Sequence, residues 1–433
     1  MSTARGVARD VLVRVEDGAY ANLTLPEALR RTGLDSRDRA FATDLVYGTL
    51  RARRRVDALL APQGRRPIAD LDPPVRAALR LGAYQLLAGV APHAAVGETV
   101  AVTPPRARGY VNGVLRALSA LGPPWPEPAG LAERLSYPDW IVDTLIADLG
   151  ADDARAALEA QNAPPRLTLR PNPRRVDPAA LAEELAAGGA TVTRGSVVPD
   201  AVAVRGAGDP AALPAVAEGR ATPQDQASQA VVARVGAQPG ERILDLAAAP
   251  GGKATGLGER VGDGVVVAAD VHAGRLRLVA GAAARLGLPA VHPVLADGRA
   301  LPVPAQTMDR ALVDAPCSGL GVLRRRPEAR WRVPPPTPEL VALQVDLTVA
   351  AAATVRVGGV LLYSVCTLTA AETTDVAAAV VAALGDTYRV LDPPPAPWVP
   401  RGRGALLLPQ AADTDGMFLL ALERVSGAPR VGR

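Results

Sequence analysis

Cysteine and histidine are scarce in this chain of 433 residues, which contains two cysteines and three histidines. Two cysteines cannot build a disulfide framework, and His93, His272 and His292 do not have the spacing of metal ligands. We therefore expect no bound metal, and any special role of Cys317 and Cys366 must be chemical rather than structural.

Long apolar runs are also missing. The first residues contain no continuous apolar segment of signal-peptide length, and Gln344, Asp346 and Arg356 interrupt the most apolar later stretch, 341–365. The sequence therefore predicts a soluble, cytoplasmic protein that does not contact a membrane, and we expect it to be a monomer.

Lysine is almost absent. Lys253 is the only lysine among the 48 lysine and arginine residues. Its place in a glycine-rich turn indicates that a compact ammonium group is needed there, with chance retention as the alternative. The arginines form clusters at 51–55 and 324–332 in a chain of formal net charge +4. Such clusters suit a phosphate backbone, although a solvated helix face is the commoner explanation of any single run.

The N-terminal half is organised as helices followed by a small mixed module. Apolar residues recur at helical spacing in 7–15, 37–50, 75–87 and 109–118, and a proline-rich linker follows at 122–130. The segments LTLRPN, ATVTR and AVAVRG, with a helix at 178–187, then predict a small α/β module that ends near 215.

From about residue 225, short β-rich runs alternate with helical stretches. This alternation predicts a parallel sheet with helices on both faces. Two further runs, TYRVLDP and MFLLALERV, are expected to close the sheet as a hairpin. The five principal runs are 242–248, 264–270, 290–297, 309–316 and 358–366.

The turn after the first of these runs has the features of a cofactor site. It matches neither a dinucleotide-binding glycine motif nor a P-loop, which argues against NAD and ATP. Asp270, Asp297 and Asp314 end the next three runs, at the sheet edge where ligands bind. One such aspartate is usually a cap, but three beside a small-residue turn indicate adenosine, and S-adenosylmethionine best fits the missing phosphate-binding features. The turn comprises Ala247, Ala248, Ala249, Pro250, Gly251, Gly252 and Lys253.

The two cysteines follow the fourth and fifth runs, so a parallel sheet would bring both to the rim that holds the cofactor. A thiolate beside a methyl donor suits methylation of a pyrimidine at carbon 5, because its addition to carbon 6 makes carbon 5 nucleophilic. A second cysteine can assist when the carbon 5 proton leaves and the thiolate is expelled.

These motifs resemble a known family. DLAAAPGGK, DAPCSG and YSVCTL are similar to those of the Sun-type RNA 5-methylcytosine methyltransferases, and ARDVL, DRAFATDLVYGTLR, LRLGAYQLL and GYVNGVLR resemble the NusB-type helical RNA-binding fold. The resemblance covers nearly the whole chain. It implies an all-α NusB-like domain at 1–122, a linker with a small RRM-like α/β module at 123–215, and a Rossmann-like class I methyltransferase domain at 216–433.

The resemblance also implies roles for individual residues. Cys366 would be the nucleophile and Cys317 would assist product release, with Lys253 and Asp314 near the reacting centre. The turn Ala247–Lys253, Asp270, Asp297 and Asp314 would contact S-adenosylmethionine. The expected substrate is 16S ribosomal RNA of the small subunit, either naked or in a partly assembled subunit, with an unstacked target cytosine. The arginines at 51–55 are predicted to help bind it.

The chain departs from the family pattern at two places, and two alternatives remain. Ala247 stands where the family often has a cysteine, and after Cys366 only Glu372 remains of the usual residues. Pro316-Cys317 matches the minimal motif of a DNA cytosine methyltransferase, so spacing alone leaves the order of the two cysteines open. A non-catalytic RNA-binding assembly factor that has kept the sheet is the second alternative.

Overall fold

The computed structural model describes residues 3–426, which form two compact units. The first unit comprises the chain up to Ala163 together with Leu323–Val333, and the second comprises Pro164–Val322 and the chain from Pro334 onward. A short segment from the C-terminal half of the sequence therefore belongs to the N-terminal unit.

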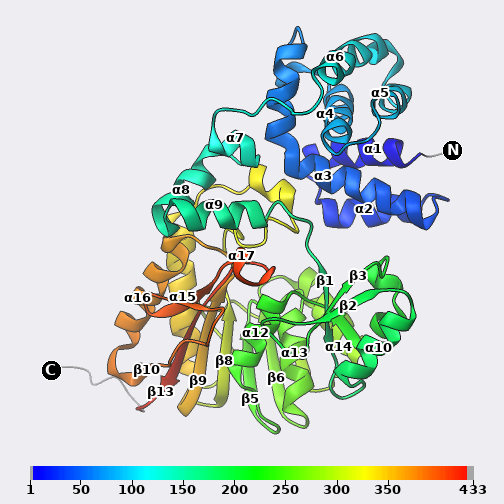
Figure 1. Ribbon diagram of the computed structural model, residues 1–433. Coiled ribbons are helices and arrows are strands. Elements are labelled where there is room, and N and C mark those ends of the chain that lie inside the picture. Colours follow the sequence, from blue (N-terminus) through cyan, green and yellow to red (C-terminus); the bar gives the residue numbers. More distant parts are fainter. Residues whose placement is uncertain (1–2, 427–433) are drawn as a thin grey trace. The chain divides into compact units, whose positions relative to one another are not determined.

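The first unit is entirely helical, as the sequence predicted (Figure 1). Its first core joins α1, α2, the start of α3 and α4, and its second core joins the end of α3 with α4, α5 and α6. A Cβ at Gly48 of α3 would lie 2.0 Å from the Tyr84 ring of α4, so glycine permits the close approach of these two helices. The helices are α1 (Ala4–Glu16), α2 (Ala21–Arg30), α3 (Ser36–Leu60), α4 (Pro73–Leu87), α5 (Pro92–Ala101), α6 (Arg108–Leu121), α7 (Leu131–Leu135), α8 (Asp139–Leu149) and α9 (Ala151–Ala160).

The second unit begins with a four-stranded antiparallel sheet in the order β2-β3-β1-β4. The element order β-α-β-β-α-β is that of a ferredoxin-like fold, which confirms the small α/β module predicted from the sequence. Its last strand, β4, lies beyond the predicted end of the module near 215. The sequence did not indicate this strand, because three residues leave almost no periodic signal. The elements are β1 (Leu167–Pro171), α10 (Pro178–Ala187), β2 (Thr191–Arg194), β3 (Val202–Arg205), α11 (Pro214–Ala217) and β4 (Ala221–Pro223).

A nine-stranded mixed sheet forms the rest of this unit. Its main path is β11-β12-β13-β9-β8-β5-β6-β7, parallel from β9 to β7, and β10 pairs with β13. The predicted parallel runs are confirmed. The last two runs pair, but the predicted hairpin is wrong, because β11 and β12 lie between them in sequence. The strands are β5 (Arg242–Leu246), β6 (Val265–Asp270), β7 (Val291–Leu295), β8 (Met308–Asp314), β9 (Val355–Val365), β10 (Tyr388–Val390), β11 (Val399–Arg401), β12 (Gly404–Leu407) and β13 (Met417–Arg424).

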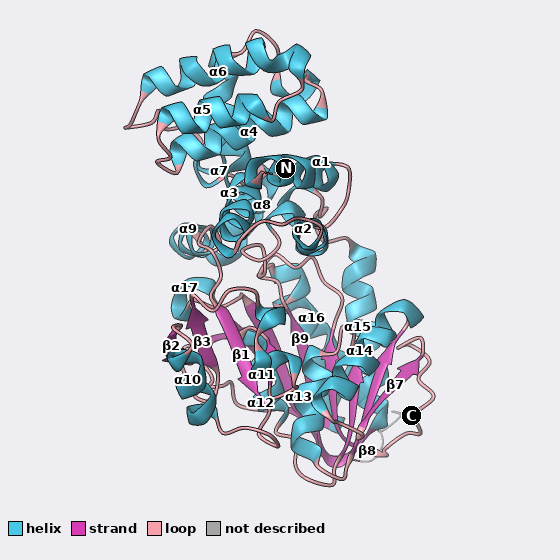
Figure 2. Cartoon of the chain, turned by 90° about the vertical axis from the view of Figure 1, so that its right-hand side faces the viewer, coloured by secondary structure: helices cyan, strands magenta, loops and turns pink. Residues whose placement is uncertain are grey.

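Helices cover both faces of this sheet. Figures 1 and 2 show α12, α13 and α14 on one face and α15 and α16 on the other. The chain runs outward from β5 through β6 to β7 and then returns to β8 on the other side of β5. Such a reversal opens a crevice at the carboxyl ends of the strands, where α/β proteins bind ligands. The helices are α12 (Gln226–Val235), α13 (Gly252–Val261), α14 (Ala273–Leu286), α15 (Pro338–Thr354), α16 (Thr374–Leu384) and the short α17 (Pro409–Ala412).

None of the helices described between residues 3 and 426 has both the length and the apolar character that a membrane crossing requires.

Candidate active site

The two cysteines meet at the carboxyl ends of β8 and β9. Cys317 follows β8, Cys366 follows β9, and their Sγ atoms lie 3.5 Å apart in hydrogen-bond contact. The hydrogen bond to Cys366, followed by burial and the nearby negative charges, raises the pKa of Cys317 well above its ordinary value. Cys317 therefore favours the protonated thiol, which can donate a hydrogen bond to Cys366.

Lys253 brings a positive charge to the same place. It lies in the first turn of α13, and its Nζ is 2.7 Å from Oδ2 of Asp314 at the end of β8. Burial lowers the pKa of Lys253, but attraction to Asp314, Cys366 and Asp245 outweighs burial and raises the pKa above its usual value. Lys253 therefore brings a charged ammonium group to the place where the two cysteines meet.

The turn Ala247–Lys253 is shaped by backbone conformations that suit close approach of a ligand. Ala247 has a φ of 59° and Gly251 a φ of 106°, both in the left-handed region. A Cβ at Gly251 would lie 3.0 Å from Cα of Val279, so this position has no room for a side chain. The backbone of this turn can therefore lie close to a ligand at the carboxyl ends of β5 and β8.

Asp270 is held rigidly beside this turn. It is buried at the end of β6, where the backbone N–H groups of Ala249 and His272 donate to its carboxylate at 3.2 and 2.9 Å. These bonds orient the carboxylate toward the carboxyl edge of the sheet, the place expected for a ribose-binding group.

Asp297 differs from the other two predicted aspartates. It follows β7 in an exposed loop and forms an ion pair of 2.7 Å with Arg299. The hydrogen bond from the Arg299 side chain lowers the pKa of Asp297 to about 2. The structure thus places Asp270 and Asp314 against the turn and the cysteines, while the Asp297 carboxylate is paired with Arg299 at the surface.

Asp245 is a buried carboxylate that the sequence interpretation missed. It is fully buried in β5, and neither of its side-chain oxygens has a hydrogen-bond partner among the described residues. Burial, and then repulsion from Asp314, raises its pKa well above the ordinary value. A buried acceptor without a partner fits a ligand that brings a donor or a positive charge, such as the α-ammonium group of S-adenosylmethionine. The signal available in the sequence was one acidic residue inside the apolar run RILDL.

Glu372 ties the two cysteine motifs together. Its carboxylate is fully buried and accepts hydrogen bonds from the Ser318 N–H at 2.8 Å, the Thr369 hydroxyl at 3.0 Å and the Gln344 amide at 3.1 Å. The Ser318 hydroxyl also donates to it. Ser318 follows Cys317 directly, so one side chain positions the loops that carry both sulfur atoms. The sequence interpretation noted Glu372 only as a retained family residue.

Arg170 connects the small antiparallel sheet to the cofactor turn. Its guanidinium donates to the carbonyl of Gly252 at 2.6 Å, and to Thr255 and Glu259 of α13 at 2.9 to 3.0 Å. Arg170 lies in β1, far from the turn in sequence, so local patterns could not have identified this contact.

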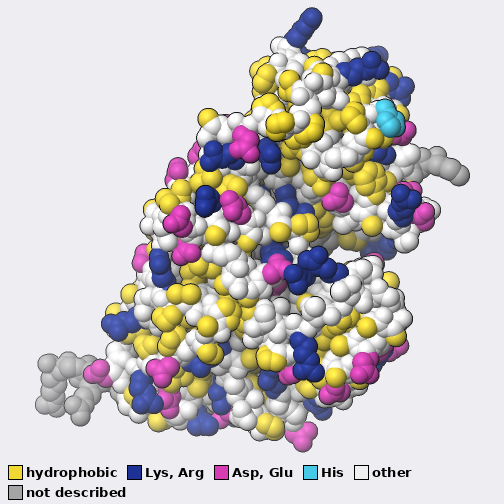
Figure 3. Space-filling view, in the orientation of Figure 1, with side chains coloured by type: hydrophobic (Ala, Val, Ile, Leu, Met, Phe, Trp, Pro, Cys, Tyr) yellow, Lys and Arg dark blue, Asp and Glu magenta, His cyan; other side chains and the backbone are white. Residues whose placement is uncertain are grey.

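Several arginines of the two clusters are buried or paired within the helical unit, whereas RNA binding by the arginines at 51–55 stays a prediction. Arg324 and Arg330 are fully buried in the helical unit, which rules out either explanation for these two. Arg54 is paired with Asp139 at 3.0 Å, and Arg51 donates to the Arg324 carbonyl at 3.2 Å. On the face drawn in Figure 3, basic side chains occur in separate groups among acidic and apolar ones rather than as a single band.

Comparison with protein families finds three matches along the chain. The model of the 16S rRNA methyltransferase RsmB/F matches residues 233–423, the NusB family matches residues 2–120, and the ferredoxin-like domain of RsmF/B-like methyltransferases matches residues 137–210. Each region corresponds to one of the architectures described above.

Named relatives match along most of their length. The chain is 38% identical over 435 residues to the ribosomal RNA small subunit methyltransferase B of Thermus thermophilus, covering 98% of both chains. It is 37% identical over 372 residues to a probable enzyme of the same name from Synechocystis, covering 82% of this chain and 83% of the relative. The probable enzyme of that name from Bacillus subtilis is 32% identical, covering 98% and 99%.

Solved structures share the fold. The crystal structure of PH0851 has a TM-score of 0.82 at 24% identity and covers 97% of this chain and 99% of its own. The structure of NSun6 from Pyrococcus horikoshii with SFG has a TM-score of 0.59 at 19% identity, covering 67% and 99%.

Proposed function

Because this chain belongs to the 16S rRNA methyltransferase RsmB/F family, we propose that it methylates carbon 5 of a cytosine in small-subunit ribosomal RNA through a covalent cysteine adduct. The cofactor of this family of methyltransferases is S-adenosylmethionine. The observation that carries the proposal is the contact of Cys317 and Cys366 at 3.5 Å beside the Lys253–Asp314 ion pair.

In the proposed reaction, Cys366 attacks carbon 6 of the cytosine as a thiolate. The new carbon–sulfur bond pushes electron density onto carbon 5, which then accepts the methyl group. Transfer of the carbon 5 proton to water allows the carbon 5–carbon 6 double bond to re-form as the carbon–sulfur bond breaks, and the Cys317 thiol can give its proton to the departing Cys366 sulfur. Bound S-adenosylmethionine supplies the electrophilic methyl group.

The surroundings of the two sulfur atoms support this order of roles. The charged Lys253 ammonium group lies near Cys366, whereas the hydrogen bond to Cys366, burial and negative neighbours raise the pKa of Cys317 and favour its protonated form. A protonated Cys317 can assist expulsion of Cys366 during product release. The reverse order, suggested by Pro316-Cys317, would place the nucleophile on the sulfur whose pKa is raised.

We assign the cofactor site to the turn Ala247–Lys253 with Asp270, Asp297 and Asp314, and we add Asp245. The position of Asp245 and the rigid carboxylate of Asp270 support this site, and Asp297 would have to leave Arg299 to take part. We also propose that the chain divides into domains at 1–122, 123–215 and 216–433. We propose further that it is a monomer in the cytoplasm.

The direct test incubates the protein with small-subunit ribosomal RNA and labelled S-adenosylmethionine, followed by mapping of 5-methylcytosine. Cys366→Ala is expected to abolish transfer because the nucleophile is gone. Cys317→Ala is expected to accumulate a protein–RNA adduct, because attack and methylation proceed while release fails. Parallel reactions on naked RNA and on partly assembled subunits identify the form of the substrate.

Three outcomes would contradict parts of the proposal. Loss of all transfer in Cys317→Ala with activity retained in Cys366→Ala would exchange the roles of the cysteines. Transfer to DNA in preference to RNA would move the protein to the DNA cytosine methyltransferases. Failure to bind S-adenosylmethionine would favour a non-catalytic assembly factor.

A further inference from the structure

The two thiols of this chain are close enough to react with each other. Cys317 and Cys366 are the only cysteines in the sequence, and their Sγ atoms lie 3.5 Å apart. Sulfur atoms in a disulfide bond are about 2.05 Å apart, so a movement of roughly 1.5 Å would bring the two atoms to bonding distance. Both cysteines are free and partly exposed, so a small reagent can reach them.

Backbone contacts keep the two cysteines adjacent. At the end of the paired strands β8 and β9, the N–H of Ala315 donates to the Ser364 carbonyl at 3.0 Å. Beyond the strand ends, the N–H of Gly321 donates to the carbonyl of Cys366 at 2.9 Å. Rotation of a side chain can change the distance between the sulfur atoms, but these bonds hold the loop of Cys317 against the loop of Cys366.

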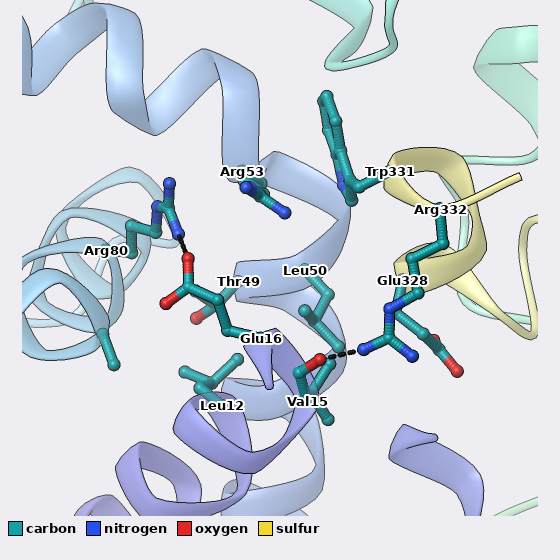
Figure 4. A pocket seen from close by; sticks show the side chains of 11 residues that line it. Leu12, Val15, Glu16, Thr49, Leu50, Arg53, Arg80, Glu328, Trp331 and Arg332 are labelled. Carbon is teal, nitrogen blue, oxygen red and sulfur yellow. Dashed lines mark hydrogen bonds and ion pairs between the residues drawn. The ribbon is translucent and has the colours of Figure 1, made fainter. Parts of the chain in front are cut away.

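The helical unit provides a contrast, because it contains no cysteine. The charged groups around its cavity are held by ion pairs and hydrogen bonds (Figure 4). Glu16 accepts from Arg80 at 2.9 Å, and Arg332 donates to the carbonyl of Val15. Neither contact depends on a thiol, so oxidation of thiols should leave the helical unit folded as before.

We propose that Cys317 and Cys366 form a reversible disulfide bond when the protein meets a peroxide, and that this modification stops methyl transfer. The Cys366 sulfur attacks one oxygen of the peroxide, the oxygen–oxygen bond breaks, and Cys366 becomes a sulfenic acid. The Cys317 sulfur then attacks the Cys366 sulfur, and the sulfur–oxygen bond breaks as the disulfide forms. Overall, two thiols and one hydrogen peroxide give one disulfide and two molecules of water.

The effect on activity rests on the proposed function. The disulfide occupies the Cys366 sulfur, which would otherwise attack carbon 6 of the cytosine, so the oxidised protein has no nucleophile. A dithiol reverses the reaction, because it becomes a disulfide itself while both cysteines return to thiols. Disulfides of cytoplasmic proteins are usually of this transient kind.

The test exposes the full chain to hydrogen peroxide without RNA and then measures its mass and its free thiols. The wild type is expected to lose the mass of two hydrogen atoms and both thiols, and dithiothreitol should restore them. Peptide mapping should find Cys317 linked to Cys366. Cys317→Ser cannot form this bond, so its reaction should stop at the Cys366 sulfenic acid, which dimedone traps.

Methyl transfer to small-subunit ribosomal RNA is measured on the same samples. Activity of the wild type should fall in proportion to the fraction of disulfide and return with dithiothreitol. The double variant Cys317→Ala, Cys366→Ala is the matched control for mass, because it reports oxidation of methionine, which adds oxygen and is not reversed by dithiothreitol. Circular dichroism and binding of S-adenosylmethionine should be the same before and after oxidation, which excludes unfolding as the cause of lost activity.

Several results would overturn the proposal. These are gain of oxygen on the wild-type cysteines without loss of hydrogen, survival of both thiols when Cys317→Ser is fully oxidised, and a disulfide that joins two chains on non-reducing electrophoresis. A disulfide within the chain that leaves methyl transfer unchanged would reject its role as a switch. If the disulfide forms but the fully reduced wild type transfers no methyl group to RNA, the modification site stands and the proposed function fails.

Discussion

Glu372 is the residue on which the geometry of the two sulfur atoms depends most directly. Its carboxylate receives donors from Ser318, Thr367, Thr369 and Gln344, and all four of these residues are buried. A carboxylate accepts at both oxygens, whereas an amide accepts at one and donates at the other. Even Glu372→Gln, which keeps the shape of the side chain, would therefore place the amide NH2 group against groups that also donate hydrogen bonds.

We predict that Glu372→Gln lowers kcat for methyl transfer more strongly than it raises KM, because the loops carrying Cys317 and Cys366 lose their common anchor. The free energy of unfolding should fall by about 2 kcal/mol, as expected for buried hydrogen bonds to a charged group. Steady-state kinetics and denaturant unfolding check the two effects. Glu183→Gln, an exposed substitution of the same type, should change neither, and an equally active Glu372→Gln enzyme would remove this role.

The buried Asp245 carboxyl group leads to a prediction about how stability depends on pH. Because its pKa is raised in the folded state, its stabilising contribution is present below the pKa of the unfolded chain and is lost as pH rises through the folded-state pKa. Without cofactor, the wild type should therefore lose stability relative to Asp245→Asn as pH rises. Chemical unfolding of both proteins over a pH series measures the difference, and parallel curves would show that Asp245 does not titrate in this way.

The same variant tests whether Asp245 contacts the cofactor. Asp245→Asn should bind S-adenosylmethionine about tenfold more weakly by calorimetry, because an amide loses the charge that pairs with an ammonium group. Unchanged affinity would remove Asp245 from the cofactor site. If Asp245→Asn is more stable than the wild type but binds S-adenosylmethionine more weakly, Asp245 serves binding at a cost in stability.

At the scale of elements, the segment Leu323–Val333 is the least expected feature. It continues from the Cys317 motif but belongs to the helical unit, where Arg330 fastens it. The Arg330 guanidinium donates to Asn162 Oδ1 at 2.7 Å and to the Gln161 carbonyl at 3.1 Å, and it stacks on Tyr137 at 3.8 Å. Burial lowers the pKa of Arg330 to about 10, so it remains charged at neutral pH.

We predict that Arg330→Met destabilises the helical unit by about 3 kcal/mol, because several buried acceptors lose their donor. Methyl transfer should also fall, since the released segment is continuous with the loop that carries Cys317. Circular dichroism during thermal unfolding and transfer assays below the melting transition measure these effects. Arg326→Met, which removes an exposed arginine of the same segment, should be close to wild type, and equal losses in the two variants would contradict a specific anchoring role.

The elements themselves were predictable where their pattern is long or strongly apolar. The sequence predicted α1, α3, α4 and α6 of the helical unit and β5 to β9 of the large sheet. It missed α2, which contains Pro26, and the short strands β4, β11 and β12. Three or four residues do not establish a period, and pairing with a distant strand is what makes them strands.

At the scale of the whole molecule, the division into two compact units predicts that S-adenosylmethionine stabilises one unit and leaves the unfolding of the other unchanged. S-adenosylmethionine at about 100 times its Kd should stabilise the unit that contains the large sheet by about 2.7 kcal/mol. Calorimetry should therefore resolve a cofactor-dependent transition and a cofactor-independent one. A single transition that shifts as a whole would show that the two units unfold together.

By itself the sequence determined the family, the three architectures, the cofactor and the candidate residues of the reaction. These depend on local features: the glycine turn after a strand, the aspartates at strand ends, and two cysteine motifs whose strands lie in a parallel sheet. Only the tertiary structure decided which arginines are buried, which carboxylates lack partners, and that Glu372 and Arg170 hold the site. Burial and pairing depend on groups far apart along the chain, so they are set only when packing brings those groups together.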